Sequence, residues 1–238
     1  MVARIGAIVQ ARMSSQRFPN KVLHEVAGKP MLQYLLERLE HCSCLDTIVV
    51  ATSAEASDKA IVDHCKEHGI AFYQGPIHDV AGRFKEVLDR YQFSSFVRVN
   101  GDSPLLDQHL IEKAVDIFFK GNFEIVTNVL KRTYPKGQSV EVLRADTFRN
   151  GYELMGKNEH FEHVTTFFYD RPDNFRMQNF ALAENLSEIH LSVDTRRDMN
   201  TFAAIISKMD RPHWQYGLEE ILSIHQQVSY TAGREPGA

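Results

Sequence analysis

Three cationic side chains follow the first apolar segment of the chain. The stretch AIVQARMSSQRFPNK, residues 7–21, contains Arg12, Arg17 and Lys21 and no acidic residue. Arginine can bind phosphate oxygens through a planar fork, and lysine can bind them as a mobile point charge. Although Lys and Arg are most often solvated surface residues, these three come directly after a strand that looks buried, in a serine-containing loop. This position favours a phosphate-binding site in residues 11–21, which we call the opening loop.

The opening loop does not match the common nucleotide-binding signatures. The P-loop pattern GxxxxGK[ST] and the dinucleotide-binding pattern GxGxxG are both absent from it. This absence disfavours ATPases and kinases of the P-loop type and dehydrogenases of the Rossmann type.

Two aspartates far apart in the sequence also follow apolar segments. Asp102 lies in VNGDSPLLD and Asp194 lies in LSVDTRRD. Each has a structural alternative, because Gly-Asp-Ser-Pro suits a turn and an aspartate can cap the helix that follows. Carboxylate oxygens are also preferred ligands of Mg²⁺, which keeps water and phosphate oxygens as its other ligands. The two aspartates therefore fit a shared Mg²⁺ site if the strands before them are neighbours, whereas Asp198 is expected to start a helix.

The first 130 residues alternate between predicted strands and predicted helices. The strands are expected at 5–10, 47–52, 70–73 and 96–100, and the helices at 31–40, 57–68, 80–91 and 107–119. This alternation predicts an α/β fold of the Rossmann-like kind, a mostly parallel sheet with helices on both faces. Such sheets bind ligands beyond the carboxyl ends of their strands. The opening loop and Asp102 both leave strands at that edge.

The alternation becomes less regular after residue 128. Residues 131–143 are expected to form a loop that runs into a strand. Further helices are predicted at 146–155, 158–172 and 199–209, and further strands at 175–180 and 189–193. We interpret the chain as one domain over 1–230, with a small β-α insertion at about 131–182 and a flexible tail at 231–238.

The composition is that of an ordinary globular protein. Of the 238 residues, 43% are hydrophobic and 24% are charged, and the net charge is -4. This charge argues against a protein that coats nucleic acid or an anionic membrane, so neither partner is expected. The three cysteines suit reduced thiols better than a disulfide framework. With neither a signal-peptide pattern nor a long apolar stretch in the sequence, we expect a soluble, cytoplasmic protein.

Seven segments spread over residues 5–198 together resemble one family. They are IVQARMSSQRFPNKVL, AGKPML, VVATS, VRVNGDSPLLD, YPKGQSVEVL, EHVT and SVDTRRD. The chain resembles the cytidylyltransferases that activate acidic sugars, and is most similar to the spore coat polysaccharide biosynthesis protein F group. That group is related to the acylneuraminate and ketodeoxyoctulosonate (KDO) cytidylyltransferases. The resemblance implies a nucleotide-diphospho-sugar transferase-like fold and transfer of CMP from CTP to an acidic sugar hydroxyl, with Mg²⁺ as cofactor and pyrophosphate as product, for surface polysaccharide or glycoconjugate synthesis.

The resemblance also implies roles for individual residues. The implied catalytic residues are Arg12, Lys21, Asp102 and Asp194, of which Asp102 and Asp194 would bind the metal. The implied nucleotide-binding residues are Arg12, Ser14, Ser15, Lys21, Ala51, Thr52, Ser53 and Asp102, with residues 51–53 lining a small pocket that excludes purines. The candidates for binding the sugar are Lys136, Gln138, Glu141, Glu162 and His163, and the cation of Lys136 suits a substrate carboxylate.

Two residues of the opening loop depart from the family pattern, which commonly has glycine where this chain has Ser14 and Asn20. Asn20 is a mild change because asparagine tolerates left-handed backbone angles. Ser14 matters more if the backbone there must approach a phosphate closely.

Three other functions are alternatives to the cytidylyltransferase hypothesis. A nucleotidyltransferase that uses another nucleotide on a sugar phosphate usually has a glycine-rich loop after its first strand, which is absent. A metal-dependent glycosyltransferase would have a DxD motif, which VNGDSP lacks. A nucleotide-binding protein that has lost catalysis is supported only by Ser14. The expected partners are CTP and an acidic sugar, and a homodimer is compatible with the resemblance.

Overall fold

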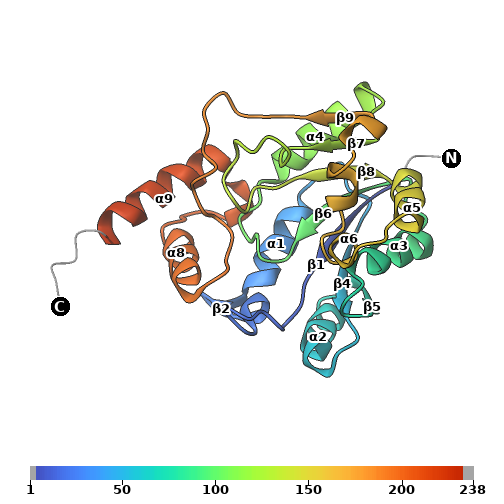
Figure 1. Cartoon of the computed structure of the whole chain (residues 1–238). Coiled ribbons are helices and arrows are strands. Elements are labelled where there is room, and N and C mark those ends of the chain that lie inside the picture. Colours follow the sequence, from blue (N-terminus) through green and yellow to red (C-terminus); the bar gives the residue numbers. More distant parts are fainter. Residues whose placement is uncertain (1–3, 233–238) are drawn as a thin grey trace.

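A seven-stranded sheet forms the centre of the protein in the computed structural model, which describes residues 4–232 (Figure 1). The strand order is β5-β4-β1-β6-β8-β7-β9. Its strands are β1 (Ile5–Gln10), β4 (Thr47–Ser53), β5 (Ala71–Gly75), β6 (Ser95–Asn100), β7 (Ile125–Thr127), β8 (Glu141–Arg144) and β9 (Met177–Asn179). All neighbouring strands pair in parallel except β8, which runs antiparallel to β6 and β7. A separate two-stranded ladder joins β2 (Glu25–Val26) to β3 (Lys29–Pro30).

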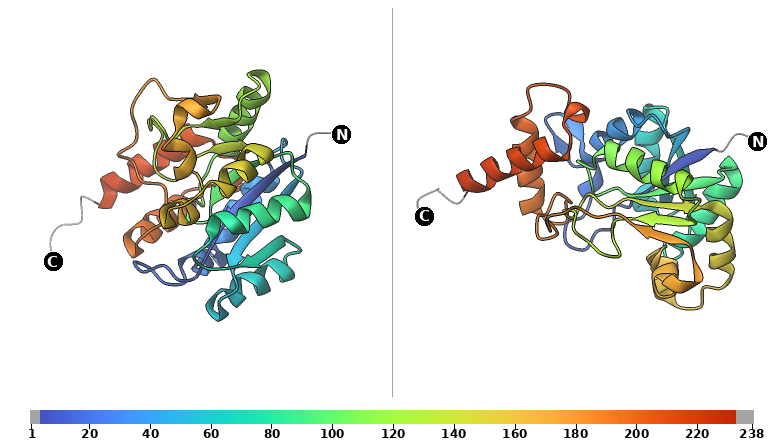
Figure 2. Two further views of the ribbon diagram at one scale, coloured as in Figure 1. Left: turned by 45° about the vertical axis from the view of Figure 1, so that its right-hand side comes forward. Right: turned by 90° about the horizontal axis from the view of Figure 1, so that it is seen from above.

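Helices cover both faces of this sheet (Figure 2). One hydrophobic cluster joins the sheet to α1 (Met31–Glu40), α2 (Lys59–Glu67), α4 (Gln108–Lys120), α8 (Arg196–Ser207) and α9 (Leu218–Ala232). The cluster on the other face contains α3 (Val80–Tyr91), α5 (Ala145–Glu153) and α7 (Thr166–Tyr169). Strand residues alternate between the two clusters, as when Ala7 and Val9 face one and Ile8 faces the other. A mostly parallel sheet between two helical layers is therefore confirmed.

The remaining elements are short. They are α6 (Asn158–Glu162) and the 3₁₀ turns η1 (Lys21–Leu23), η2 (Ala56–Asp58), η3 (Pro172–Asn174) and η4 (His213–Gln215). Among residues 4–232, no helix combines the length and apolarity needed to cross a membrane.

The first half of the chain follows the sequence-based prediction closely. The bounds of β1, α1 and α3 are the predicted ones, and β4, β5, β6 and α4 differ by one or two residues at their ends. Asp107 caps α4 as expected, because its carboxylate accepts a hydrogen bond from the N–H of His109 at 3.0 Å. The hydrophobic periodicity of this region was therefore sufficient to place its elements.

The predicted helix over 158–172 is wrong as a continuous helix. It is broken between α6 and α7, where Val164 has a φ of 48°. The Val164 side chain is fully buried in the α3 face of the core. Burial of this side chain in a left-handed turn therefore overrides the helical pattern of the sequence.

The strand predicted at 189–193 is also wrong. Only one isolated bridge, Lys136 to His190, forms there. The backbone N–H groups of Leu191 and Ser192 both donate to the Lys136 carbonyl, and that of Val193 donates to Asp102. The segment is therefore held by loops rather than by a neighbouring strand. The prediction also missed α9, whose last two residues, 231 and 232, fall in the predicted tail; residues 233–238 of that tail lie outside the described residues.

The guanidinium of Arg38 holds residues 213–216 against α1. This side chain is fully buried on α1 and donates to the carbonyls of Leu106 (2.7 Å), His213 (2.5 Å) and Tyr216 (2.7 Å). Burial lowers the pKa of Arg38 to about 10, with Asp107 opposing the shift, so the group stays charged at neutral pH. The three carbonyls thus satisfy a charge that would be costly to bury alone.

We predict that Arg38→Met lowers the free energy of unfolding by about 3 kcal/mol, because it leaves three carbonyls without their charged donor. Urea unfolding followed by circular dichroism measures this difference. The matched control is Arg90→Met, at an exposed position in the last turn of α3, with an expected change within about 0.5 kcal/mol. Equal stabilities of the two variants would contradict the role given to Arg38.

Candidate active site

The Lys21 side chain joins the opening loop to both predicted acidic residues. Its ammonium donates to Asp102 Oδ2 at 3.2 Å, to Asp194 Oδ1 at 3.0 Å and to the Val193 carbonyl at 2.7 Å. Only 8% of the Lys21 side chain is exposed, whereas 32% of Asp102 and 30% of Asp194 are exposed. The structure therefore brings together the three residues beyond the carboxyl ends of β1 and β6. We refer to Asp102 and Asp194 as the carboxylate pair.

The opening loop folds back on itself before it reaches Lys21. The Met13 carbonyl accepts hydrogen bonds from the N–H groups of Ser15 (2.9 Å) and Asn20 (3.0 Å). Asn20 has a φ of 63°, a left-handed conformation that asparagine adopts more readily than most residues. Asn20 is thus suited to the turn that leads the chain into η1, which begins at Lys21.

A buried carboxylate, Asp58, fixes the opening loop to the end of β4. Its Oδ1 accepts from the N–H of Met13 at 2.7 Å, and its Oδ2 accepts from the N–H (3.1 Å) and hydroxyl (2.5 Å) of Ser53. The sequence pattern predicts Asp58 only as part of the helix at 57–68 and gives no sign of these contacts. In the structure Asp58 directly precedes α2 but makes no cap hydrogen bond, since its oxygens bind the loop and the strand instead.

The loop that carries Asp102 touches the opening loop directly. The N–H of Gly101 donates to the Gln10 carbonyl at 2.9 Å. A Cβ atom at position 101 would lie 2.9 Å from that carbonyl oxygen and 3.0 Å from the Ala11 Cβ. Glycine is therefore required there for the loops after β1 and β6 to approach closely enough for Lys21 to reach Asp102.

A capping box positions Asp194. The Asp198 carboxylate accepts from the N–H groups of Asp194 (3.0 Å) and Thr195 (2.8 Å), and the Thr195 hydroxyl accepts from the N–H of Asp198. Burial raises the pKa of Asp198, but these hydrogen bonds outweigh it and the net shift is downward. The expectation that Asp198 starts a helix is confirmed. Asp194 lies beside Asp102 because the N–H of Val193 donates a hydrogen bond to the Asp102 carbonyl at 2.8 Å. The two aspartates do not follow adjacent strands.

The oxygen atoms around Lys21 have the chemistry of a divalent-cation site. Two carboxylates and one backbone carbonyl already converge on a single positive charge. Among the described residues, no group of three or more His, Cys, Asp or Glu side chains could hold a metal. Mg²⁺ is commonly bound through one or two carboxylates, with water and phosphate oxygens as its other ligands. The carboxylate pair therefore fits a Mg²⁺ ion that is shared with a phosphorylated substrate.

The other polar residues of the opening loop surround this cluster. Arg17 forms an ion pair with Asp194, with its Nη2 2.8 Å from Oδ1, and 66% of its side chain is exposed. Arg12 lies 3.8 Å from Glu162, which links the loop to α6. Ser14 is exposed, and Ser15 accepts from the N–H of Phe18 at 3.4 Å. The loop thus presents exposed cations beside the buried ammonium.

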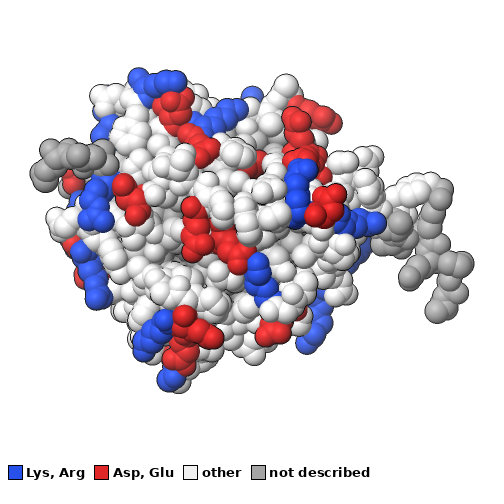
Figure 3. All heavy atoms as spheres, turned by 180° about the vertical axis from the view of Figure 1, so that it is seen from behind, with Lys and Arg blue, Asp and Glu red and all other residues white. Residues whose placement is uncertain are grey.

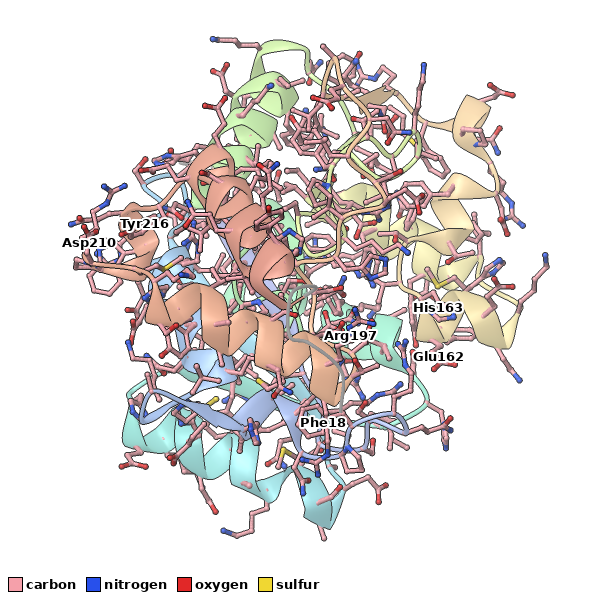
Figure 4. The ribbon with its side chains drawn as sticks, turned by 90° about the vertical axis from the view of Figure 1, so that its left-hand side faces the viewer. Phe18, Glu162, His163, Arg197, Asp210 and Tyr216 are labelled. Atoms are coloured by element: carbon pink, nitrogen blue, oxygen red, sulfur yellow. The ribbon has the colours of Figure 1, made fainter. Side chains whose placement is uncertain are left out.

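Figure 4 shows the surroundings of the opening loop, which contains Phe18. Arg197 lies on α8, and Glu162 and His163 lie at the end of α6. The guanidinium of Arg196 lies 5.0 Å from the centre of the Phe18 ring, which connects the loop to the start of α8.

The residues implied for a base pocket are buried beneath the loop. The side chain of Ala51 packs in the cluster with α3, and Ser53 is bound by Asp58. Thr52 is fully buried, and its hydroxyl has no hydrogen-bond partner among the described residues. A contact between residues 51–53 and a pyrimidine stays a prediction.

Two of the implied sugar-binding residues are buried in hydrogen-bond networks. Gln138 donates to the Leu105 carbonyl at 2.7 Å and accepts from the N–H of Asp107 at 2.9 Å. Glu141 forms an ion pair with Arg98 and accepts from the Tyr169 hydroxyl at 2.6 Å. Burial raises the pKa of Glu141, but Arg98 and the hydrogen bonds outweigh it, so the net shift is downward and the group is ionised at neutral pH.

The other three implied sugar-binding residues are exposed. The ammonium of Lys136 lies 3.0 Å from His190 Nε2, and Glu162 and His163 lie at the end of α6. Of these three, Glu162 reaches the opening loop, through Arg12. A contact with a sugar stays a prediction for all five residues.

Two arginines near the site were not singled out from the sequence. Arg98 lies in β6, where it forms an ion pair with Glu141 and donates from its Nε to Gln10 Oε1 at 3.3 Å. A charged residue inside a buried strand pattern signals such a partner. Arg83 of α3 is buried and donates to the Pro76 carbonyl at 2.7 Å. Burial lowers its pKa against the effect of Asp58, and its Nε has no partner among the described residues.

Charge is mixed on the face of the molecule that lies at the back in the view of Figure 1. Figure 3 shows Lys and Arg side chains interspersed with Asp and Glu on that face. Among the described residues seen there, the cations do not form the continuous basic surface that a nucleic-acid-binding protein presents.

Comparison with known proteins identifies the family of the chain. A family model described as cytidylyltransferase matches residues 6–235. The chain is 28% identical over 213 residues to the spore coat polysaccharide biosynthesis protein SpsF of Bacillus subtilis, covering 86% of this chain and 88% of that protein. It is 30% identical over 195 residues to a 3-deoxy-manno-octulosonate cytidylyltransferase of Trichlorobacter lovleyi, covering 80% and 74% of the two chains.

A solved structure described as a cytidylyltransferase from Leptospira borgpetersenii has the same fold. Its TM-score is 0.91 at 23% sequence identity, and the match covers 99% of both chains. Because the family model spans almost the whole sequence, the chain belongs to the cytidylyltransferase family and is a nucleotidyltransferase.

Proposed function

We propose that the protein transfers CMP from CTP to a hydroxyl group of an acidic sugar of the nonulosonic or octulosonic type, and releases pyrophosphate. The observation that carries the proposal is the contact of Lys21 with both members of the carboxylate pair at the ligand-binding edge of the sheet. The family supports the transfer of CMP. The acidic sugar rests on relatives such as the 3-deoxy-manno-octulosonate cytidylyltransferase.

The residues around the cluster can position and neutralise a triphosphate. In the reaction, the sugar hydroxyl loses its proton to solvent and its oxygen bonds to the α-phosphorus, while the bond from that phosphorus to the bridging oxygen of pyrophosphate breaks. Lys21, Arg12 and Arg17 place three cations where the charge of the departing pyrophosphate has to be balanced. Mg²⁺ held by the carboxylate pair would supply further neutralisation of the phosphate oxygens.

The sugar side is proposed to lie toward α6 and the loop before β8. Glu162 borders the opening loop, and Lys136 offers an exposed ammonium to a substrate carboxylate. The product would be a CMP-sugar used to build a surface polysaccharide or glycoconjugate, in keeping with the name of the Bacillus subtilis relative.

The proposal is tested by a screen for pyrophosphate release. CTP, UTP, ATP and GTP are each offered with a panel of nonulosonic and octulosonic acids, with and without Mg²⁺. We expect release only with CTP, an acidic sugar and Mg²⁺ together. Release with another nucleotide and a sugar phosphate would instead favour a different nucleotidyltransferase, and CTP binding without any release would indicate a protein that has lost catalysis.

We predict that Asp102→Asn and Asp194→Asn each lower kcat by about 100-fold or more, because each removes one charged ligand of the metal. Steady-state pyrophosphate release at saturating CTP measures the effect, and circular dichroism verifies the fold. The matched control is Asp116→Asn, which removes an exposed carboxylate that pairs with Lys120 on α4. A normal kcat in either variant of the carboxylate pair would remove the metal assignment.

We predict that Arg12→Ala raises the KM for CTP by about tenfold and leaves the fold intact, since its side chain is nearly half exposed and its ion pair with Glu162 is long. The KM is measured at saturating sugar and Mg²⁺. An unchanged KM would place Arg12 outside the triphosphate site.

A further inference from the structure

The oxygens proposed to hold the metal are already bound by a cation of the protein itself. All three N–H bonds of the Lys21 ammonium have an acceptor, namely Asp102, Asp194 and the Val193 carbonyl. We infer that Lys21 and a divalent cation compete for the carboxylate pair, so that the metal binds tightly only after nucleotide phosphates draw Lys21 away. This inference rests on the proposed function, because it describes how the same site takes up metal and CTP.

Geometry makes the competition direct. The ammonium contacts Asp102 Oδ2 and Asp194 Oδ1 at 3.2 and 3.0 Å, so it lies between the two carboxylates. A divalent cation held by both carboxylates would need the space that the ammonium now occupies. Two cations that close repel each other. Only 8% of the Lys21 side chain is exposed, so water screens its charge weakly, although Asp102 and Asp194 are 32% and 30% exposed.

The net charge of the cluster also favours competition between Lys21 and the metal. Arg17 also binds Asp194 Oδ1, at 2.8 Å. Two carboxylates therefore face two cations, Lys21 and Arg17, and the cluster is neutral. Adding a divalent cation alone would leave an excess of two positive charges at a partly buried point. Adding it together with a triphosphate removes this positive excess, because the phosphates bring negative charge and provide new acceptors for both side chains.

The position of Lys21 in the chain allows such a transfer. It begins η1, directly after the left-handed turn at Asn20, so its backbone is fixed while its four-carbon stem can change rotamer. The opening loop from which it projects also carries Arg12 and Arg17, whose side chains are 46% and 66% exposed. A triphosphate bound along that loop would lie within reach of all three cations.

Titration with Mn²⁺, followed by the electron paramagnetic resonance signal of the free ion, tests the competition without requiring turnover. The wild-type protein is titrated alone and with saturating CTP in the absence of sugar, and the Mn²⁺ that CTP binds by itself is measured in the same titration without protein and subtracted. We expect CTP to tighten Mn²⁺ binding by about tenfold or more. In Lys21→Met, Mn²⁺ alone should bind about tenfold more tightly than to the wild type, and the further gain from CTP should shrink.

Two further variants serve as a control and as a second test of the competition. Arg12→Met removes a cation that pairs with Glu162 and not with the carboxylate pair, so Mn²⁺ binding without CTP should stay unchanged. Arg17→Met removes an exposed cation that does contact Asp194, so it should tighten Mn²⁺ binding by about threefold. This second variant keeps the test decisive if Lys21→Met does not fold, because Arg17 lies at the surface.

The outcomes separate the inference from the proposed function. If Lys21→Met, or Arg17→Met in its place, binds Mn²⁺ no more tightly than the wild type, the competition is overturned, whatever CTP does. If the variants bind Mn²⁺ more tightly but CTP has no effect on wild-type binding, the competition holds and the use of CTP fails. Tightening of Mn²⁺ binding in Lys21→Met/Asp194→Asn equal to that in Lys21→Met would also overturn the inference, because the gain would then not depend on the carboxylate pair.

Discussion

A largely buried ammonium has to be surrounded by oxygen atoms, and this requirement organises the carboxyl edge of the sheet. The three acceptors of Lys21 come from two regions that are 81 and 173 residues away from it in the sequence. The loop after β1, the loop after β6 and the segment before α8 must therefore meet at one point. Two backbone hydrogen bonds make this possible: the N–H of Gly101 donates to the Gln10 carbonyl, and the N–H of Val193 donates to the Asp102 carbonyl.

Three other charged side chains keep these segments in place without taking part in the cluster. Asp58 holds Met13 to the end of β4, and Asp198 orients the backbone at Asp194. Arg38 binds the carbonyl of Leu106, a few residues beyond Asp102. Each of these groups satisfies backbone atoms in loops, where no strand or helix does so. The result is a site in which most of the ordering comes from side chain to backbone hydrogen bonds.

The sequence predicted those parts that depend on local periodicity and on the ends of strands. The apolar patterns of β1, α1 and α3 were enough to place them, and the positions of Lys21, Asp102 and Asp194 after apolar segments indicated one edge of the sheet. Contacts between distant loops could not be inferred in the same way. The 189–193 segment is apolar like a strand, yet its N–H groups bind loop carbonyls. The break at Val164 and the anchoring role of Asp58 likewise depend on what each side chain meets in three dimensions.

The acceptors of the Arg38 guanidinium have a consequence for how the protein is made. Two of its three carbonyl partners, at His213 and Tyr216, are synthesised 175 and 178 residues after Arg38 itself. A nascent chain that lacks them would expose a guanidinium in the last turn of α1 to water and leave that face of the helix unpacked. The core on this side can therefore close only after residues 213–216 have been synthesised.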